Sequence, residues 1–404
     1  MSGFPNELID AIVDENQDDK AALRACSLVN HSWTYSSQRH IFSRVNFNNK
    51  RTNNFGQRHS QRSIEHFYTL ICAHPYIATL VKAVDVSPLL DAGLLGCTLE
   101  KLTKLESISI DLCGFHWDEL SPCLRDTLVA TLRSLRITNL ELREGQFPHC
   151  ADFLAVLGGS SHLKRLTLSG VSCGNFSDSQ IGTENTNGLG PQLESLAISL
   201  YDHSYFALLK LLQSSVNLGS LDRLSVLTAG SGHPAERVGI AKEILRRLSG
   251  SPLKHLALNI CLGEPLSNLI DVSQLRSIHI RLWWIRLDQH TKPDEWLRWI
   301  SAMFQEFAQW HRMEEVTFEI FYASDFTVYA DEWAALDAVL GRIQSLRKVH
   351  LRLDNYDVAR ARWRHLREYP NSLGDGTKCV LPALAERKIL FVEVRLPSSC
   401  SRLL

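Results

Sequence analysis

One short pattern of apolar residues recurs along most of the chain. An apolar residue, two variable residues, a second apolar residue, one variable residue and a third apolar residue occur together in eleven copies. The second and third apolar positions lie two residues apart, so in an extended strand both side chains point to the same face. The pattern therefore predicts a series of short strands with one buried face. The copies begin at Val81, Leu105, Leu132, Leu163, Leu193, Leu221, Leu253, Leu275, Met313, Leu346 and Ile389.

The segments between these copies carry apolar residues at helical spacing. Examples are Ile64–Ile71, Ile240–Leu248 and Trp333–Leu340. Strands that alternate with helices indicate an α/β fold with a parallel sheet and right-handed crossovers. Successive copies begin 22 to 43 residues apart, which overlaps and exceeds the roughly 20 to 29 residues of leucine-rich repeats. We therefore predict an irregular, right-handed solenoid that resembles leucine-rich repeats over residues 64–404.

The N-terminus carries a different apolar pattern. Two short segments have helical spacing, and the first follows a proline, which favours the first turn of a helix. Two or three short helices form a core that is too small to be stable without help. We therefore expect part of their apolar surface to face a partner. The apolar positions are Leu8, Ile9, Ile12 and Val13 behind Pro5 in the first helix, and Leu23, Cys26 and Val29 in the second.

These residues form a motif that resembles a known module. The chain reads Phe-Pro-x-Glu-Leu-Ile-x-x-Ile-Val from Phe4, and then Cys-Ser-Leu-Val-x-x-x-Trp as far as Trp33. Residues 1–45 are similar to the F-box, the all-α module through which cullin-type (SCF) ubiquitin ligases bind their substrate receptors. Asn16 departs from that family, which usually has leucine there. The resemblance implies that an adaptor subunit, and through it a cullin, is contacted by Pro5, Leu8, Ile9, Ile12, Val13, Leu23, Leu28 and Val29, with Trp33 partly in the core.

A polar, basic segment separates the two patterns. Residues 46–63 contain no Asp or Glu, and the apolar periodicity fails there. This composition is typical of a linker. Basic residues interleaved with Phe47 and Phe55 could instead contact a nucleic-acid backbone. The chain as a whole has 43 Lys plus Arg against 44 Asp plus Glu, so a solvated connector is favoured and nucleic acid is not expected as a partner.

Motifs that carry enzyme chemistry are missing from the sequence. There is no phosphate-binding loop, nucleophile elbow, His-Glu-x-x-His helix, zinc-finger spacing or dinucleotide-binding glycine fingerprint. We therefore expect no catalytic residue, cofactor or metal. The ten cysteines include no Cys-x-x-Cys pair, and no apolar run reaches the length of a membrane span. A protein of the cytoplasm or nucleus, with reduced thiols and no membrane contact, is expected.

Tryptophan is concentrated in the C-terminal third, where seven of nine lie between Trp283 and Trp363. Longer crossover helices that need bulkier side chains in a thicker core would explain this. A recognition surface is the alternative, because exposed tryptophan is a favoured anchor for binding. The residues singled out for contact with a target are Arg281, Trp284 and Arg286.

Two functions remain open from the sequence. In the first, the chain is the substrate-recognition subunit of an SCF ubiquitin ligase, with the N-terminal helices on the adaptor and the solenoid on an unknown protein target. In the second, it is an interaction scaffold or sensor outside any ligase, and the N-terminal helices cap the apolar end of the solenoid. The first function is what the F-box resemblance implies.

Overall fold

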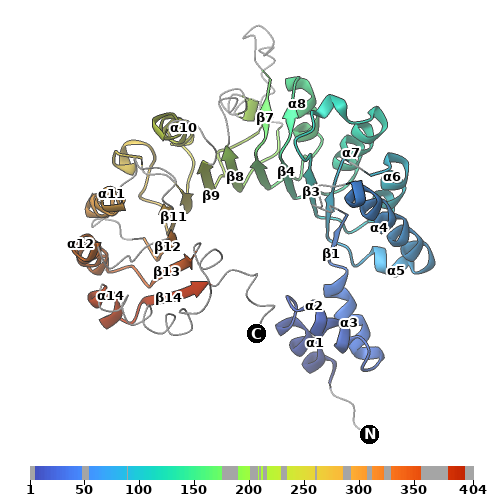
Figure 1. The fold of residues 1–404 in the computed structure, drawn as a ribbon, viewed down its shortest axis with the longest axis horizontal. Coiled ribbons are helices and arrows are strands. Elements are labelled where there is room, and N and C mark those ends of the chain that lie inside the picture. Colours follow the sequence, from blue (N-terminus) through green and yellow to red (C-terminus); the bar gives the residue numbers. More distant parts are fainter. Residues whose placement is uncertain are drawn as a thin grey trace. The chain divides into compact units, whose positions relative to one another are not determined.

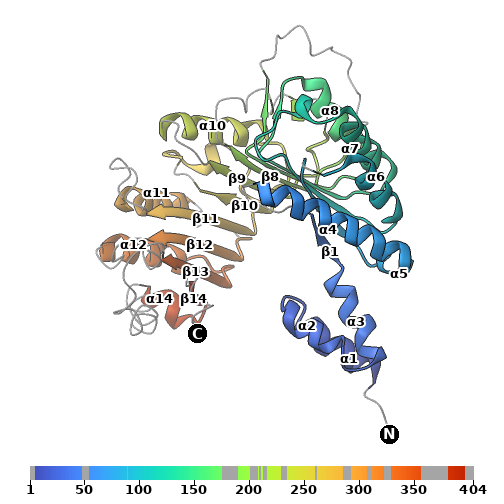
Figure 2. The ribbon, with the colours of Figure 1, turned by 45° about the vertical axis from the view of Figure 1, so that its right-hand side comes forward.

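The computed structural model of the chain consists of two compact units. The first comprises Met1–Leu193 and Asp202–Asn217, and the second comprises Glu194–Tyr201 and Leu218–Leu404. Figures 1 and 2 show the elements in sequence colours. The structure describes residues 5–47, 54–88, 90–174, 190–200, 208, 211–212, 216–228, 234–259, 262–284, 293–306, 312–322, 329–355 and 381–395.

The first unit begins with three helices and continues with alternating helices and strands. Its five main strands are parallel and follow the order in which they occur in the chain: β1 (Arg44–Asn46), β2 (Ala83–Val86), β3 (Ser107–Asp111), β4 (Asn139–Arg143) and β6 (Arg165–Ser169). Two shorter strands, β5 (Gln146–Phe147) and β7 (Ser172–Cys173), form a second parallel pair. The helices described up to residue 174 are α1 (Asn6–Glu15), α2 (Lys20–Cys26), α3 (His31–Ile41), α4 (Asn54–Ala73), α5 (Pro75–Ala78), α6 (Ala92–Lys101), η1 (Trp117–Glu119), α7 (Pro122–Ser134) and α8 (Cys150–Gly158).

The second unit repeats the alternation of strand and crossover. Its seven described strands are also parallel and in chain order: β8 (Ser195–Leu200), β9 (Arg223–Thr228), β10 (His255–Leu258), β11 (Ser277–Trp284), β12 (Glu315–Tyr322), β13 (Lys348–Asn355) and β14 (Leu390–Arg395). The described helices are α10 (Pro234–Arg247), η3 (Leu266–Asn268), α11 (Pro293–Glu306), α12 (Ala330–Gly341) and α14 (Pro382–Glu386). The predicted α/β fold with parallel strands is confirmed.

The core of each unit lies between the strands and the helices. The second apolar position of the sequence pattern lies in register on neighbouring strands, and the side chains there are buried: in the first unit Val84 pairs with Ile108, and in the second Ile278 pairs with Val316. In the first unit α4 to α8, and in the second unit the described helices, lie on one face of the strands (Figures 1 and 2). Side chains at the alternate strand positions point to the opposite face.

One predicted strand is wrong. The apolar copy over 132–137 falls on the end of α7 and the turn after it, and β4 begins only at Asn139. Leu124, Leu128 and Leu132 are buried at four-residue spacing, so they form the apolar stripe of a helix. This helix begins at Pro122, directly after its cap residue Ser121. The same apolar pattern occurs again five residues later, at Ile137, Leu140 and Leu142, and these three side chains are buried.

The predicted linker over 46–63 is also corrected. Asn46 is the last residue of β1, and Phe47 is buried with its ring 5.5 Å from that of Phe67 in an edge-on packing. Residues 54–63 form the first half of α4, which continues through the predicted helix at Ile64–Ile71. Residues 48–53 lie outside the described residues. No described helix is long and apolar enough to cross a membrane.

Candidate functional site

The three N-terminal helices have a core of their own. Ile9 and Val13 of α1 and Leu23 of α2 are buried together. Cys26, Trp33 and Ile41 pack against them and are partly buried. We call residues 6–41 the helical module. Three of the residues predicted to contact an adaptor, Ile9, Val13 and Leu23, are therefore taken up by the module's own core, and Trp33 contributes to it.

Other predicted contact residues lie on the surface of this module. Leu8 is 51% exposed and Ile12 is 41% exposed, and the two lie one turn apart on α1. Leu28 is 86% exposed and Val29 is 62% exposed, both in the turn between α2 and α3. Pro5, which precedes α1, is exposed as well. We call Leu8, Ile12, Leu28 and Val29 the exposed apolar residues.

The turn that carries Leu28 and Val29 is held by side-chain hydrogen bonds. Asn30 caps α3, since its Oδ1 accepts from the backbone N–H of Ser32 and of Trp33 at 3.0 and 3.2 Å. The Thr34 hydroxyl donates to the Ser27 carbonyl at 2.8 Å and so joins α3 to the end of α2. The two apolar side chains thus extend from a fixed turn.

Charged and polar side chains fix α1 against α3. The Asp14 carboxylate lies 2.7 Å from Arg39 Nη2 and 2.6 Å from His40 Nε2. The hydrogen bond from His40 is the main cause that lowers the pKa of Asp14. Asn16 is the residue after the end of α1, and its Nδ2 donates to the Ile12 carbonyl at 2.8 Å.

The residues predicted to contact a target are placed only in part. Arg281 lies on β11 and its Nε is 2.6 Å from Oε2 of Glu319, its register partner on β12. The His279 ring lies 3.2 Å from the same oxygen, and its hydrogen bond, together with the charge of Arg281, lowers the pKa of Glu319 to about 2 against the effect of burial. Trp284 ends β11, but its side chain and all of Arg286 lie outside the described residues.

The same arrangement recurs two strands further along. His350 Nε2 and Arg352 Nε of β13 each lie 3.4 Å from Oε2 of Glu393 on β14. Burial, and then the charges of Arg352 and Lys348, lower the pKa of His350. The face of the second unit that points away from the core therefore carries alternating cations and carboxylates.

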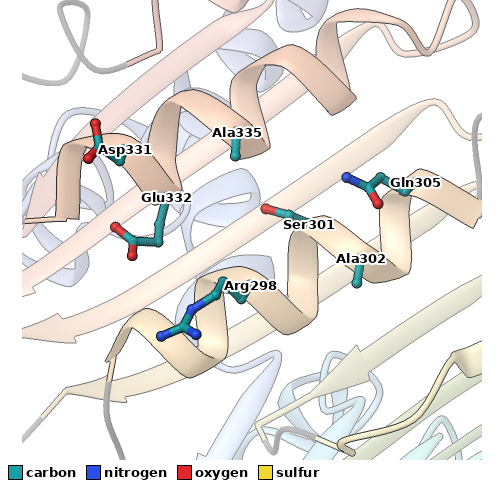
Figure 3. A pocket seen from close by; sticks show the side chains of 7 residues that line it. All are labelled: Arg298, Ser301, Ala302, Gln305, Asp331, Glu332 and Ala335. Atoms are coloured by element: carbon teal, nitrogen blue, oxygen red, sulfur yellow. The ribbon is translucent and has the colours of Figure 1, made fainter.

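A hollow of about 330 Å³ lies on the helical side of the second unit, between α11 and α12. Ser301 of α11 and Ala335 of α12 face each other across it, and Arg298 and Glu332 lie at one end (Figure 3). The Arg298 guanidinium is already paired with Asp294 of its own helix. The charged residues that line the hollow are Arg298, Asp331 and Glu332. Within the described ranges, no group of three His, Cys, Asp or Glu side chains could hold a metal ion.

Comparisons with known proteins add no assignment. No protein-family model matches this sequence. No curated protein matches it either. The functional argument therefore depends on the surfaces of this chain alone, and chiefly on the exposed apolar residues of the helical module.

Proposed function

We propose that this protein is the substrate-recognition subunit of a cullin-type ubiquitin ligase. The helical module acts as an F-box that binds the adaptor subunit, and the strand array, a right-handed solenoid similar to leucine-rich repeats, binds a protein target. The protein supplies binding and position, and a separate conjugating enzyme carries out the covalent chemistry.

The observation that carries this proposal is the division of the module's apolar stripe. Ile9 and Val13 face the interior, while Leu8 and Ile12 of the same helix stay at the surface. With Leu28, Val29 and the ring of Tyr35, they leave five large hydrophobic side chains exposed on a module that has only three buried apolar residues. Such a concentration of apolar side chains at the surface is typical of a protein-binding site.

The module's self-contained core favours docking over capping. A cap would turn its apolar side chains toward the strand array, yet Ile9, Val13 and Leu23 pack among themselves. Beyond the module, the chain buries Phe47 against Phe67 of α4 next to the first strand. The exposed apolar residues are therefore available to a second protein.

The test is a double substitution, Leu8→Asp with Ile12→Asp, in the full chain. Complete burial of an apolar side chain of this size contributes about 1.5–3 kcal/mol. Leu8 and Ile12 are about half exposed in the free protein, so roughly half of that free energy is gained when the adaptor covers each of them. Two buried charges without partners add a further penalty. We expect the dissociation constant for the purified adaptor to rise at least about a hundredfold.

The control for this experiment is Phe115→Asp. Phe115 is an exposed apolar residue outside the module, in the turn after β3. This variant is expected to bind the adaptor as the unaltered chain does. The proposal is refuted if the double variant keeps its circular dichroism spectrum and still binds the adaptor with an affinity close to that of the unaltered chain.

A further inference from the structure

The strands of the second unit begin at a rim that is rich in basic side chains. A hollow of about 470 Å³ lies there, lined by Lys254, Arg276, Arg347 and Lys348 among others. Backbone hydrogen bonds of 2.7 Å from Arg276 N to the Lys254 carbonyl and of 2.9 Å from Arg347 N to the Glu314 carbonyl join the residues that precede successive strands. The cations thus come from the starts of β10, β11 and β13.

Carboxylates are interposed between these cations. Glu314 and Glu315, at the start of β12, also line the hollow, as does Asp222, which precedes β9 and whose Oδ2 lies 3.7 Å from Lys254 Nζ. Glu315 Oε1 lies 3.1 Å from Lys348 Nζ, while Glu314 is 3.9 Å from Arg276. The second of these ion pairs is loose, so Arg276 keeps donors for another partner.

His255 lies beside Lys254 and Arg276 at the β10 and β11 side of the hollow, where these two cations face one carboxylate, Asp222. Its Nδ1 lies 2.7 Å from the Ser277 hydroxyl. Burial lowers the pKa of His255, and Arg223, Lys254 and Arg276 lower it further although Asp222 acts in the opposite direction. An anionic group of a ligand is therefore favoured at this end of the hollow.

From β10 to β13 the order of charge along the rim is positive, negative, positive, and strand spacing sets its scale. Neighbouring strands lie roughly 4.8 Å apart, so the midpoint of β10 and β11 is roughly 12 Å from β13, with β12 between. In an extended peptide, side chains two residues apart share a face, and four residues span roughly 13 Å. A peptide laid across the strands would thus present its residues i, i+2 and i+4 to β10/β11, β12 and β13 in turn.

We infer that this rim is a binding site for an extended peptide segment with acidic residues at i and i+4 and a basic residue at i+2. The acidic side chains pair with Lys254 and Arg276 at one end and with Arg347 at the other, and the basic side chain pairs with Glu314. Carboxylates suit the site because Glu314 and Glu315 repel a more highly charged group. The idea that a ligase target docks here rests on the proposed function. Binding of the peptide itself does not depend on that function.

The experiment measures fluorescence anisotropy of labelled nine-residue peptides with the purified full chain. The probe carries glutamate at positions 3 and 7 and lysine at position 5, with glycine and serine elsewhere. A second peptide has the same composition with its two glutamates adjacent, and a third carries phosphoserine in place of both glutamates. Variants of the protein are Arg276→Gln and Arg347→Gln, with Arg342→Gln as the control, since Arg342 is exposed at the end of α12 in the same unit.

We expect each rim variant to weaken binding of the probe about fivefold, as for loss of one exposed ion pair, and the control to leave it unchanged. The peptide with adjacent glutamates is expected to bind more weakly than the probe. The inference is overturned if Arg276→Gln and Arg347→Gln behave like the control, if peptide order makes no difference, or if the phosphoserine peptide binds more than tenfold tighter. No adaptor is present, so failure here leaves the proposed ligase function to its own test.

Discussion

The substitution Leu23→Ala tests whether the helical module is a separate folding element. Leu23 is 1% exposed and is one of three buried apolar residues in the module. A buried leucine replaced by alanine costs about 2–5 kcal/mol. A segment of fewer than about 40 residues has little stability to lose. We therefore expect α1, α2 and α3 to unfold in this variant while the strand array stays folded.

Hydrogen exchange followed by mass spectrometry separates the two outcomes. Amide protection over residues 6–41 should fall toward that of an unfolded chain, while the strands β2, β3 and β4 keep theirs. Leu28→Ala is the matched control, because that side chain is 86% exposed and its loss should change stability by less than about 0.5 kcal/mol. Equal loss of protection in the strands would refute the reasoning and favour a cap, and unchanged protection in α1–α3 would show that Leu23 does not hold the module together.

Two further predictions concern the second unit. The pKa of Glu319 is lowered from 4.5 to about 2, so its ionised form contributes stability above pH 4.5 that is lost as the pH falls toward 2. Glu319→Gln should remove about 2 kcal/mol of this pH dependence, as measured by urea unfolding at pH 5 and pH 3. Buried Asp337 accepts from the backbone N–H of Ala383 and Leu384 at the start of α14. Asp337→Ala should cost about 1–3 kcal/mol and lower hydrogen-exchange protection in α14 and β14, whereas unchanged protection there would contradict this role.

The strands could be predicted from the sequence because their apolar positions are the core. Ile278 and Val349 are buried at the second position of the pattern, as expected from spacing alone. The copy at 132–137 failed because apolar residues three apart fit a helix as well as a strand. Leu128 and Leu132 continue a helical stripe there, and the chain is still helical at Ser134. The first half of α4, residues 54–63, was missed because its sequence is polar and shows no apolar face.

The candidate sites were predictable only to the level of the segment. Spacing groups Leu8, Ile9, Ile12 and Val13 into one stripe, but this stripe is wider than the face one small core can cover. Ile9 and Val13 are buried because α1 packs against α2 and α3 on that side. The sequence of α1 alone does not specify which side of the stripe will be buried. The basic rim was missed for another reason: Lys254, Arg276 and Arg347 stand at variable positions of the pattern, and the spacing of the apolar residues does not constrain those positions.

The hydrogen-bonded turn between α2 and α3 has a consequence for how tightly any partner is held. Because Asn30 and Thr34 order this turn in the free protein, the backbone at Leu28 and Val29 loses little conformational entropy when a partner covers these residues. Affinity then depends on residues that never touch the partner. A change that loosens the Thr34 hydroxyl from the Ser27 carbonyl would weaken association through disorder in the unbound chain, with every atom of the interface still in place.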